Sequence, residues 1–148
     1  MNDAHSPEQQ LAIRCSESLH SRDQTAAMLG ISIESSTPGK AVMRMTVRKD
    51  MTNGHAICHG GMIFTLADTA FAHACNNTNA MTVASACHID FVAPAFVDDV
   101  LTGTAQERSR SGRTGIYDID VTKQDGSLIA VFRGKSHQIN GQVIPAES

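Results

Sequence analysis

The sequence predicts an α+β fold in which a curled antiparallel sheet of about five strands wraps around one long buried helix. The run from Met62 to Cys75 is apolar at almost every position, which is typical of a helix buried on nearly all sides. Strand-like segments joined by short turns follow this run with no helix between them, and strands connected in this way pair antiparallel. The two features complement each other, because the sheet has one face to cover and the helix lacks a polar face.

Two short helical segments are expected within residues 1–30. Ser6 and Pro7 are typical of an N-cap followed by proline at the first helical position, so we expect a helix over residues 8–20. One face of that helix is apolar and carries Leu11, Cys15 and Leu19. A second helical turn over residues 24–29 ends at a glycine.

Alternating polar and apolar residues predict the strands. The first strand covers residues 31–49 and is interrupted at Thr37-Pro38-Gly39 by a turn or a bulge. A loop over residues 50–59 leads into the central helix, expected at about residues 61–77. The later strands and hairpin turns are expected at residues 82–91, 100–108, 115–123 and 127–139, with turns at Ser111-Gly112 and Asp125-Gly126. This order is that of the α+β hotdog architecture. The central helix is too apolar for one five-stranded sheet to cover, so we also expect a partner subunit.

The composition fits a single domain over residues 1–148 with a substantial core. Hydrophobic residues make up 41% of the 148 residues, and the formal net charge of -3 removes any general attraction to nucleic acid. No apolar run is long enough to span a bilayer and the N-terminus carries no secretory signal, so we expect a cytoplasmic protein with no membrane partner. The four cysteines have neither metal-binding nor disulfide spacing.

The first candidate site lies where the central helix begins. Gly60 and Gly61 precede the apolar run, and a helix N-terminus presents unpaired N–H groups with a partial positive charge. Glycine lets a ligand approach that backbone closely, which suits the developing oxyanion of a thioester or ester carbonyl. The same glycines also fit a tight turn that binds nothing, and His-Gly-Gly alone is a weak pattern.

Asp68 is the second candidate, because a carboxylate inside an apolar helix is costly unless it is paired, hydrogen-bonded or used in chemistry. It is either a nucleophile or general base acting at an acyl carbon, or an acid tied to Thr65, Thr69 or the backbone. Asp68 lies eight residues beyond Gly60, which is about 12 Å along a helix. One helix cannot bring both groups to one carbonyl carbon, so their joint action requires a second chain running the other way.

The loop before the helix carries further polar residues. His59 is expected to hydrogen-bond the loop backbone and to hold the Gly60 N–H in place, and Asn53 to do the same or to contact the substrate carbonyl. A zinc site at His55 and His59 is disfavoured, because their spacing suits zinc only on a helix and the glycines make this segment a loop. A catalytic pair of Cys58 with His59 is disfavoured because adjacent side chains point apart. We therefore expect no metal.

Ser85 is a candidate within the strand at residues 82–91. Its expected face also carries Val83, Cys87 and Ile89. A hydroxyl among apolar neighbours either positions a water beside the acid or bonds to its own sheet.

Basic residues gather late in the chain. Arg133 and Lys135 alternate on one strand face, while Arg108 and Arg113 flank the Ser111-Gly112 hairpin. Such a patch suits phosphates, and coenzyme A carries several phosphate groups. The alternative is a solvated, charged strand end.

An ordered set of motifs runs through the chain. They are NGH at 53–55, CHGG at 58–61, LADTAFA at 66–72, VASACHIDF at 83–91, TGIYDI at 114–119 and FRGKSH at 132–137. With these motifs, roughly residues 29–141 closely resemble the phenylacetate-degradation thioesterase (PaaI) family of hotdog acyl-CoA thioesterases.

The resemblance implies a role for most of these residues. The Gly60 N–H would polarise the thioester carbonyl, with His59 and Gly61 beside it, and Asp68 of the neighbouring subunit would be the nucleophile or general base. Asn53 would orient the carbonyl or the attacking water. Thr69 would support the acid, and Ser85 would place water. The resemblance also implies homodimers with shared active sites that pair into homotetramers, no cofactor beyond the coenzyme A of the substrate, and aryl groups such as phenylacetyl or hydroxyphenylacetyl.

Two other functions remain open. A hotdog enoyl-CoA hydratase or dehydratase would use a histidine with an acid at the acyl α and β carbons, and Asp68 has no obvious histidine partner. A non-catalytic acyl-CoA-binding sensor would not need Asp68 and would carry an added DNA- or partner-binding segment. Residues 1–30 are too short and too weakly basic for that.

Overall fold

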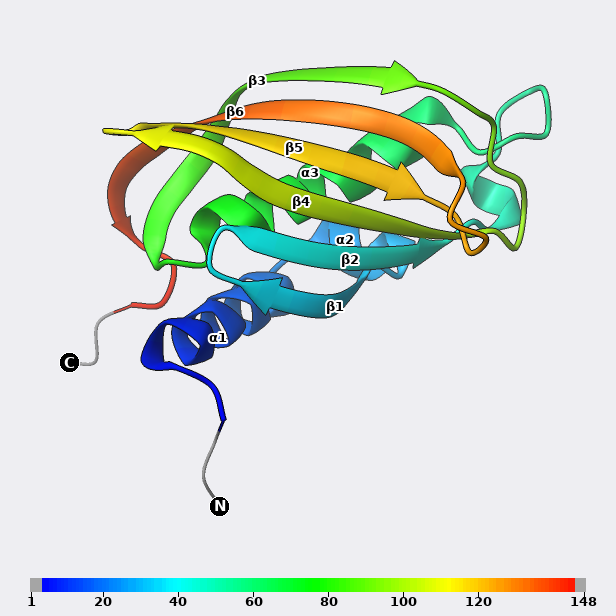
Figure 1. Cartoon of the computed structure of the whole chain (residues 1–148). Coiled ribbons are helices and arrows are strands. Elements are labelled where there is room, and N and C mark those ends of the chain that lie inside the picture. The colour runs from blue at the N-terminus through cyan, green and yellow to red at the C-terminus, as the bar shows by residue number, and fades with distance from the viewer. Residues whose placement is uncertain (1–3, 146–148) are drawn as a thin grey trace.

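A six-stranded antiparallel sheet curls around the central helix in the computed structural model, which describes residues 4–145 (Figure 1). The helix, α3, spans Gly60–Asn76. The strands are β1 (Ser32–Thr37), β2 (Lys40–Thr46), β3 (Ala80–Phe91), β4 (Val100–Ser111), β5 (Thr114–Thr122) and β6 (Leu128–Gln142). Their order across the sheet is β1-β2-β4-β5-β6-β3. The predicted arrangement of a curled sheet around one buried helix is confirmed.

The predicted first strand is two strands, which raises the count from about five to six. Thr37 pairs with Lys40, so the chain reverses at Pro38-Gly39 and continues as an antiparallel neighbour. Gly39 has a φ of 73°, a left-handed conformation that favours glycine. The turn interpretation of this interruption was therefore right, and β1 forms one edge of the sheet.

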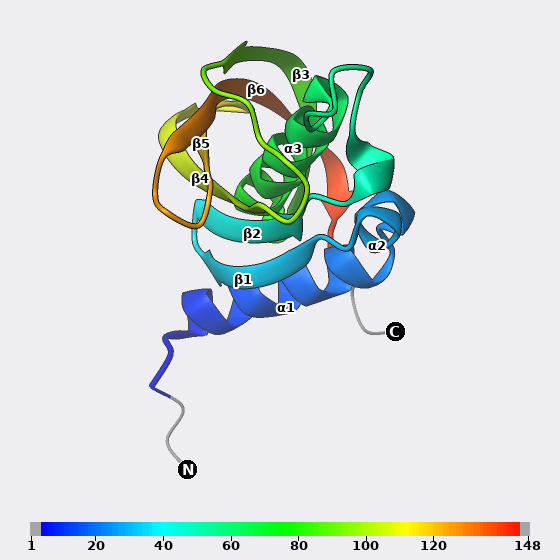
Figure 2. The same ribbon diagram turned by 90° about the vertical axis from the view of Figure 1, so that its right-hand side faces the viewer.

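The N-terminal helices α1 (Pro7–Ser21) and α2 (Gln24–Leu29) lie outside the curl of the sheet, whereas α3 lies inside it (Figure 2). Ser6 caps α1 by accepting a hydrogen bond from the N–H of Gln9, and Asp23 caps α2 in the same way. α1 packs against both β1 and α3. A single 3-10 turn, η1 (Lys49–Met51), follows β2. Between residues 4 and 145, no helix is long and apolar enough to cross a membrane.

Close contact between α3 and β6 depends on one glycine. Phe71 of α3 is 1% exposed, and its ring packs edge-on against Tyr117 with 5.5 Å between ring centroids. A Cβ atom on Gly134 would lie 2.7 Å from the Phe71 ring. Because real Cβ contacts are never this short, only glycine lets the helix sit so close to the strand.

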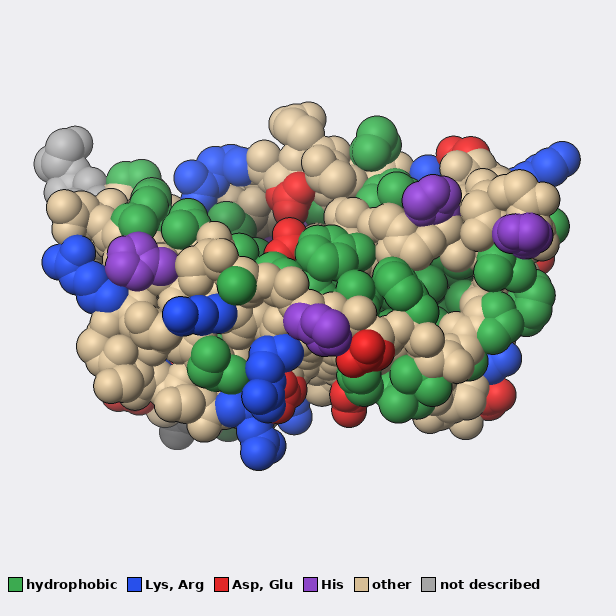
Figure 3. Space-filling view, turned by 90° about the horizontal axis from the view of Figure 1, so that it is seen from above, with side chains coloured by type: hydrophobic (Ala, Val, Ile, Leu, Met, Phe, Trp, Pro, Cys, Tyr) green, Lys and Arg blue, Asp and Glu red, His purple; other side chains and the backbone are tan. Residues whose placement is uncertain are grey.

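Within residues 4–145, the other edge of the sheet is β3, which pairs with β6 alone; β3 and the residue after it expose apolar side chains. Val83 is 45% exposed, Phe91 53% and Val92 57%. Hydrophobic side chains also gather at the right of the surface in Figure 3, the end of the molecule where β3 finishes. A long unpaired edge with apolar side chains is a template for pairing with another chain.

Candidate active site

The N-terminus of α3 offers one unused backbone donor. His59 is the N-cap residue, and its Nδ1 accepts a hydrogen bond from the Gly61 N–H at 3.0 Å. The His59 N–H itself donates to the Met51 carbonyl at 2.7 Å, which fixes the loop. Within residues 4–145, nothing accepts a hydrogen bond from the Gly60 N–H. This donor and the partial positive charge of the helix end suit a carbonyl oxygen that is becoming negative.

A cavity of about 490 Å³ opens over this helix end. It is lined by Asn53, Gly60, Ile63, Phe91 and Pro94 among others. A Cβ on Gly60 would lie 3.0 Å from Cζ of Phe91, so the ring covers the glycine closely. The cavity is therefore apolar on one side and carries backbone and amide donors on the other.

Asn53 holds the loop and still has an unused amide. Its Oδ1 accepts hydrogen bonds from the N–H groups of His55 at 2.9 Å and Ile57 at 3.4 Å. These two bonds fix which end of the amide is oxygen. No acceptor in the described part of the chain bonds to Nδ2, and Asn53 lines the Gly60 cavity. The amide N–H groups are thus available to a ligand there.

Asp68 is half-buried and receives no hydrogen bond from any residue between 4 and 145. Thr65 donates its hydroxyl to the Gly61 carbonyl at 2.9 Å, and Thr69 donates its hydroxyl to the Thr65 carbonyl at 2.7 Å. The interpretation in which a threonine ties the carboxylate is therefore wrong in this structure. Burial raises the pKa of Asp68, and the nearby charge of Asp23 raises it further.

Asp68 and the N-terminus of α3 line different cavities. Asp68 lines a cavity of about 400 Å³ with Phe71, Ala72 and Cys75 of the same helix, and Gly60 is not part of its wall. This separation agrees with the spacing of about 12 Å along the helix. One chain therefore presents two half-sites: the Gly60 half-site with its N–H donor, and the Asp68 half-site with its carboxylate.

Ser85 is bonded to its own sheet. Its hydroxyl donates to the Lys135 carbonyl at 3.1 Å, and the residue is exposed and outside the lining of the Asp68 cavity. Its role in placing water stays a prediction.

The expected face of β3 is wrong, because a β-bulge lies at Ser85. Ala84 pairs with Ser136, and Ala86 pairs with the preceding residue of β6, so one residue of β3 is left over. Both Ala84 and Cys87 consequently lie opposite buried residues of β6. Val83 and Cys87 therefore do not share a face, as simple alternation would require.

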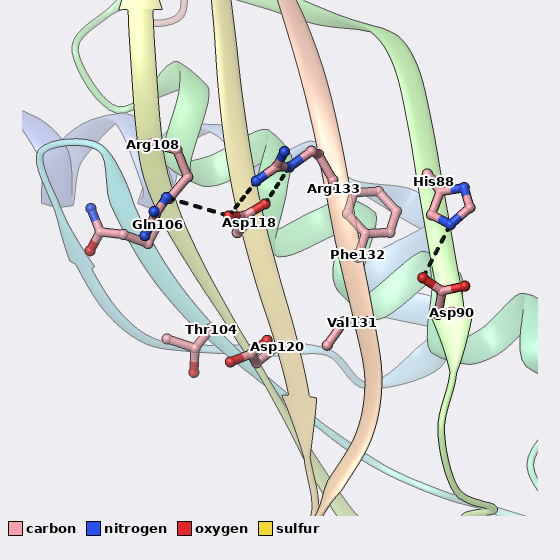
Figure 4. Close-up of a pocket in the computed structure, with 10 residues that line it drawn as sticks. All are labelled: His88, Asp90, Thr104, Gln106, Arg108, Asp118, Asp120, Val131, Phe132 and Arg133. Carbon is pink, nitrogen blue, oxygen red and sulfur yellow. Dashed lines mark hydrogen bonds and ion pairs between the residues drawn. The ribbon is translucent and has the colours of Figure 1, made fainter.

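The basic residues occupy the outer face of the sheet and share a carboxylate. Arg133 donates through Nε and Nη2 to the two oxygens of Asp118 at 2.7 and 2.9 Å, and Arg108 approaches the same carboxylate at 3.4 Å. Figure 4 shows these side chains pointing toward one another from β4, β5 and β6. The hydrogen bonds from Arg133 lower the pKa of Asp118. Lys135 and Arg113 are exposed.

Asp118 was missed in the sequence, although a signal for it exists. Asp118 and Arg133 each lie seven residues from the Asp125-Gly126 turn, and they pair across β5 and β6. A register centred on that turn would have placed the acid opposite the arginine. The patch consequently carries less net positive charge than the sequence alone indicates.

The cysteines near the site are poorly suited to nucleophilic attack. Burial raises the pKa of Cys58 to about 11, with a smaller effect from Asp99, and burial raises the pKa of Cys75 to about 12. Both thiols thus stay protonated near neutral pH. In the described segment, no group of three or more histidine, cysteine, aspartate or glutamate side chains is arranged to hold a metal ion.

Leu19 of α1 and Arg22, the C-cap residue of that helix, were also missed. Both line the Asp68 cavity. No local pattern indicates this contact, because the two residues lie more than forty positions from the acid.

Known proteins share both the sequence and the fold of this chain. The profile of the thioesterase superfamily matches residues 55–130. The acyl-coenzyme A thioesterase PaaI of Escherichia coli (strain K12) is 51% identical over 125 residues, which cover 84% of this chain and 89% of that protein. The solved structure of the E. coli PaaI protein from the phenylacetic acid degradation operon has a TM-score of 0.89 at 48% identity, covering 90% of this chain and 97% of that one. A hypothetical thioesterase from Streptococcus pneumoniae TIGR4, solved with coenzyme A, has a TM-score of 0.72 at 25% identity, covering 76% of this chain and 87% of that one.

The profile match includes both Gly60 and Asp68, and the match to the E. coli protein extends over most of the chain. The curled sheet around α3 is shared with the E. coli structure along nearly its whole length. The chain therefore belongs to the thioesterase superfamily, within the PaaI family of hotdog-fold acyl-CoA thioesterases, and is a thioester hydrolase.

Proposed function

We propose that the protein hydrolyses aryl-acyl-CoA, such as phenylacetyl-CoA or hydroxyphenylacetyl-CoA, to the carboxylic acid and free coenzyme A in the degradation of phenylacetate or related aromatic compounds. The naming of the E. coli relative and the operon from which its structure comes support this substrate class. The apolar walls of both cavities suit an aryl group.

One observation carries the mechanism. A single helix holds an unused N–H donor at Gly60 and an unbonded carboxylate at Asp68, about 12 Å apart and in separate cavities. We infer that the active site forms in a homodimer, where Gly60 of one protomer faces Asp68 of the other. The unpaired edge of β3 and its exposed apolar side chains are the surface that such a partner would cover. Pairing of two dimers into a tetramer remains part of the proposal.

In this dimer the Gly60 N–H and the helix end stabilise negative charge on the thioester oxygen. Asp68 then acts in one of two ways. As a general base it takes a proton from water, the hydroxyl oxygen bonds to the carbonyl carbon, the C–S bond breaks, and the thiolate recovers the proton. As a nucleophile it forms a mixed anhydride and releases the thiolate, and water then hydrolyses the anhydride.

The remaining residues support these steps. Asn53 would orient the carbonyl or the water through its Nδ2. Thr69 and Ser85 would support the acid and the water once their hydroxyls leave the Thr65 and Lys135 carbonyls to which they donate in the single chain. His59 and Gly61 shape the helix end around the carbonyl oxygen.

For the phosphates of coenzyme A we propose the outer basic residues. Lys135 and Arg113 are the simpler candidates, because Arg133 and Arg108 already contact Asp118. The relative solved with coenzyme A supports a coenzyme A thioester as the substrate. Binding of phosphate by this patch should weaken as salt concentration rises.

The proposal is tested by thiol release from phenylacetyl-CoA. Asp68→Asn should remain folded and lose at least about 100-fold in kcat, the range for removal of a general base. Asp98→Asn is the matched control, because Asp98 is exposed and its φ of 75° is one that asparagine tolerates. Undiminished turnover by Asp68→Asn would remove the acid from the mechanism. Absence of thiol release from both aryl substrates by the wild-type protein would refute the substrate class.

A further inference from the structure

The Asp68 cavity has a wall that comes from outside the sheet and its central helix. Leu19 and Arg22, at the C-terminal end of α1, line it together with Met81 of β3 and Val143, which follows β6. Residues of α3, Asp68 among them, complete the lining with further residues of β3. The C-terminal end of α1 therefore contributes one wall of a cavity whose other walls come mainly from α3 and β3.

Arg22 fixes this wall in place. Its Nη2 donates to the Val143 carbonyl at 3.0 Å, and its Nε donates to the Ser18 carbonyl at 3.1 Å. One guanidinium thus ties the end of α1 to the segment after β6, across 121 positions of sequence. Charged donors make strong hydrogen bonds, and the planar group sets their direction.

A second contact holds the same turn against α3. The ring of His20 packs edge-on against His73, with 6.3 Å between centroids. His73 is 1% exposed, and neither of its ring nitrogens has a partner within residues 4–145. Leu19 precedes His20 in the chain, so its position relative to α3 is set from both sides.

The chemistry of the cavity suits the acyl part of a substrate. Its wall is mainly apolar, through Leu19, Phe71, Met81 and Val143, and Asp68 is the acid that faces it. In the proposed reaction Asp68 acts at the carbonyl carbon, so the group bonded to that carbon lies close to this cavity. The phosphates of coenzyme A require basic groups and water instead.

We propose that Leu19 determines which acyl groups are accepted, by limiting the length of the Asp68 cavity, and that Arg22 is the positioning residue that holds Leu19 there. This inference rests on the proposed thioesterase function. It assigns substrate selection to the N-terminal helix, which lies outside the hotdog sheet.

The test compares kcat/KM for phenylacetyl-CoA and 4-phenylbutanoyl-CoA, which has two more methylene groups between the ring and the carbonyl. Leu19→Ala should raise the ratio of the longer to the shorter substrate by about 10-fold or more, because one methylene in an apolar pocket is worth about 10- to 200-fold. Leu19→Phe should lower the same ratio. Leu19→Met, which nearly conserves volume, should leave it close to the wild-type value. Arg22→Ala should shift the ratio in the same direction as Leu19→Ala, and by less.

Leu11→Ala is the matched control, since Leu11 lies eight residues earlier on the same helix and outside the cavity wall. A merely structural loss lowers activity on both substrates equally and leaves their ratio unchanged. The inference is overturned if Leu19→Phe, and Leu19→Ala where it folds, keep the wild-type ratio. Failure of the wild-type protein to hydrolyse either substrate instead refutes the proposed function.

Discussion

Two defective chains should restore one another if each active site combines Gly60 of one protomer with Asp68 of its partner. The first defect is Gly60→Pro, which removes the N–H donor. Proline is tolerated at the first position of a helix, and the ψ of 133° at His59 is one that a residue before proline adopts. The second defect is Asp68→Asn, which removes the acid.

The expected activities follow from the loss that each substitution causes and from the number of intact sites in the mixture. Loss of one oxyanion donor reduces kcat by about 100- to 1,000-fold. Asp68→Asn is expected to lose at least about 100-fold. When the two chains assemble at random in equal amounts, half of the two-fold dimers contain unlike chains, and one of the two sites in each is intact. The mixture should therefore show about one quarter of wild-type activity.

The assay is thiol release by protein co-expressed from one message, with the ratio of the two chains determined by intact mass. Gly60→Ala is the matched control for the proline, because both place a Cβ about 3.0 Å from Phe91 and only proline lacks the N–H. Gly60→Ala should therefore retain far more activity than Gly60→Pro.

If both groups acted within one chain, every site of the mixture would carry one defect. Activity would then stay at the level of the separate variants, about 1% or less. That result would refute the two-chain site even if both variants were correctly folded and dimeric.

Three further predictions concern stability. Burial raises the pKa of Asp68, so the folded state loses stability as pH rises from the usual carboxyl pKa to the raised one. Asp68→Asn should therefore raise the melting temperature at pH 7 and leave it unchanged near pH 3. Equal shifts at both pH values would contradict this. Burial lowers the pKa of His73 to about 4, so as pH falls the unfolded state binds a proton before the folded state does. The free energy of unfolding, measured with urea, should therefore fall by about 3 kcal/mol between pH 6.5 and pH 4. His73→Phe should lose that slope. Gly134→Ala should lower the free energy of unfolding by about 1–3 kcal/mol, because the new methyl group overpacks against Phe71. Gly103→Ala is the control and should lower it by less, because its Cβ would make ordinary contacts at 3.5 Å. Equal losses in urea unfolding would refute the packing argument.

The elements whose signals are local were predicted well from the sequence. Ser6 and Pro7 begin α1 as expected, and Gly30 ends α2 with a left-handed φ of 69°. The central helix begins at Gly60, one residue earlier than expected, because His59 supplies the N-cap. Caps and turns depend on neighbouring residues, so their chemistry is readable in a short window.

Features that depend on pairing between distant strands were predicted less well. The bulge at Ser85 is set by how β3 pairs with β6, and alternation within β3 alone does not reveal it. The partnership of Asp118 with Arg133 is different, because it depends on the register of the β5–β6 hairpin, which the Asp125-Gly126 turn indicates. The position of Leu19 in the lining of the Asp68 cavity depends on how α1 packs against α3, which the local sequence does not reveal.

In the proposed dimer, Asp68 links stability, assembly and catalysis in one helix. Alone, the chain leaves a half-buried carboxylate without a hydrogen-bond donor, and burial raises the pKa of that group. In the proposed dimer the N-terminus of the partner's α3 brings an unused N–H and a partial positive charge toward it, both of which favour the ionised acid. The contact that completes the active site would thus also offset part of the cost of burying this carboxylate in the isolated chain. This arrangement requires a helix that is apolar almost all round, that carries one acid, and whose N-terminus has an unused N–H group.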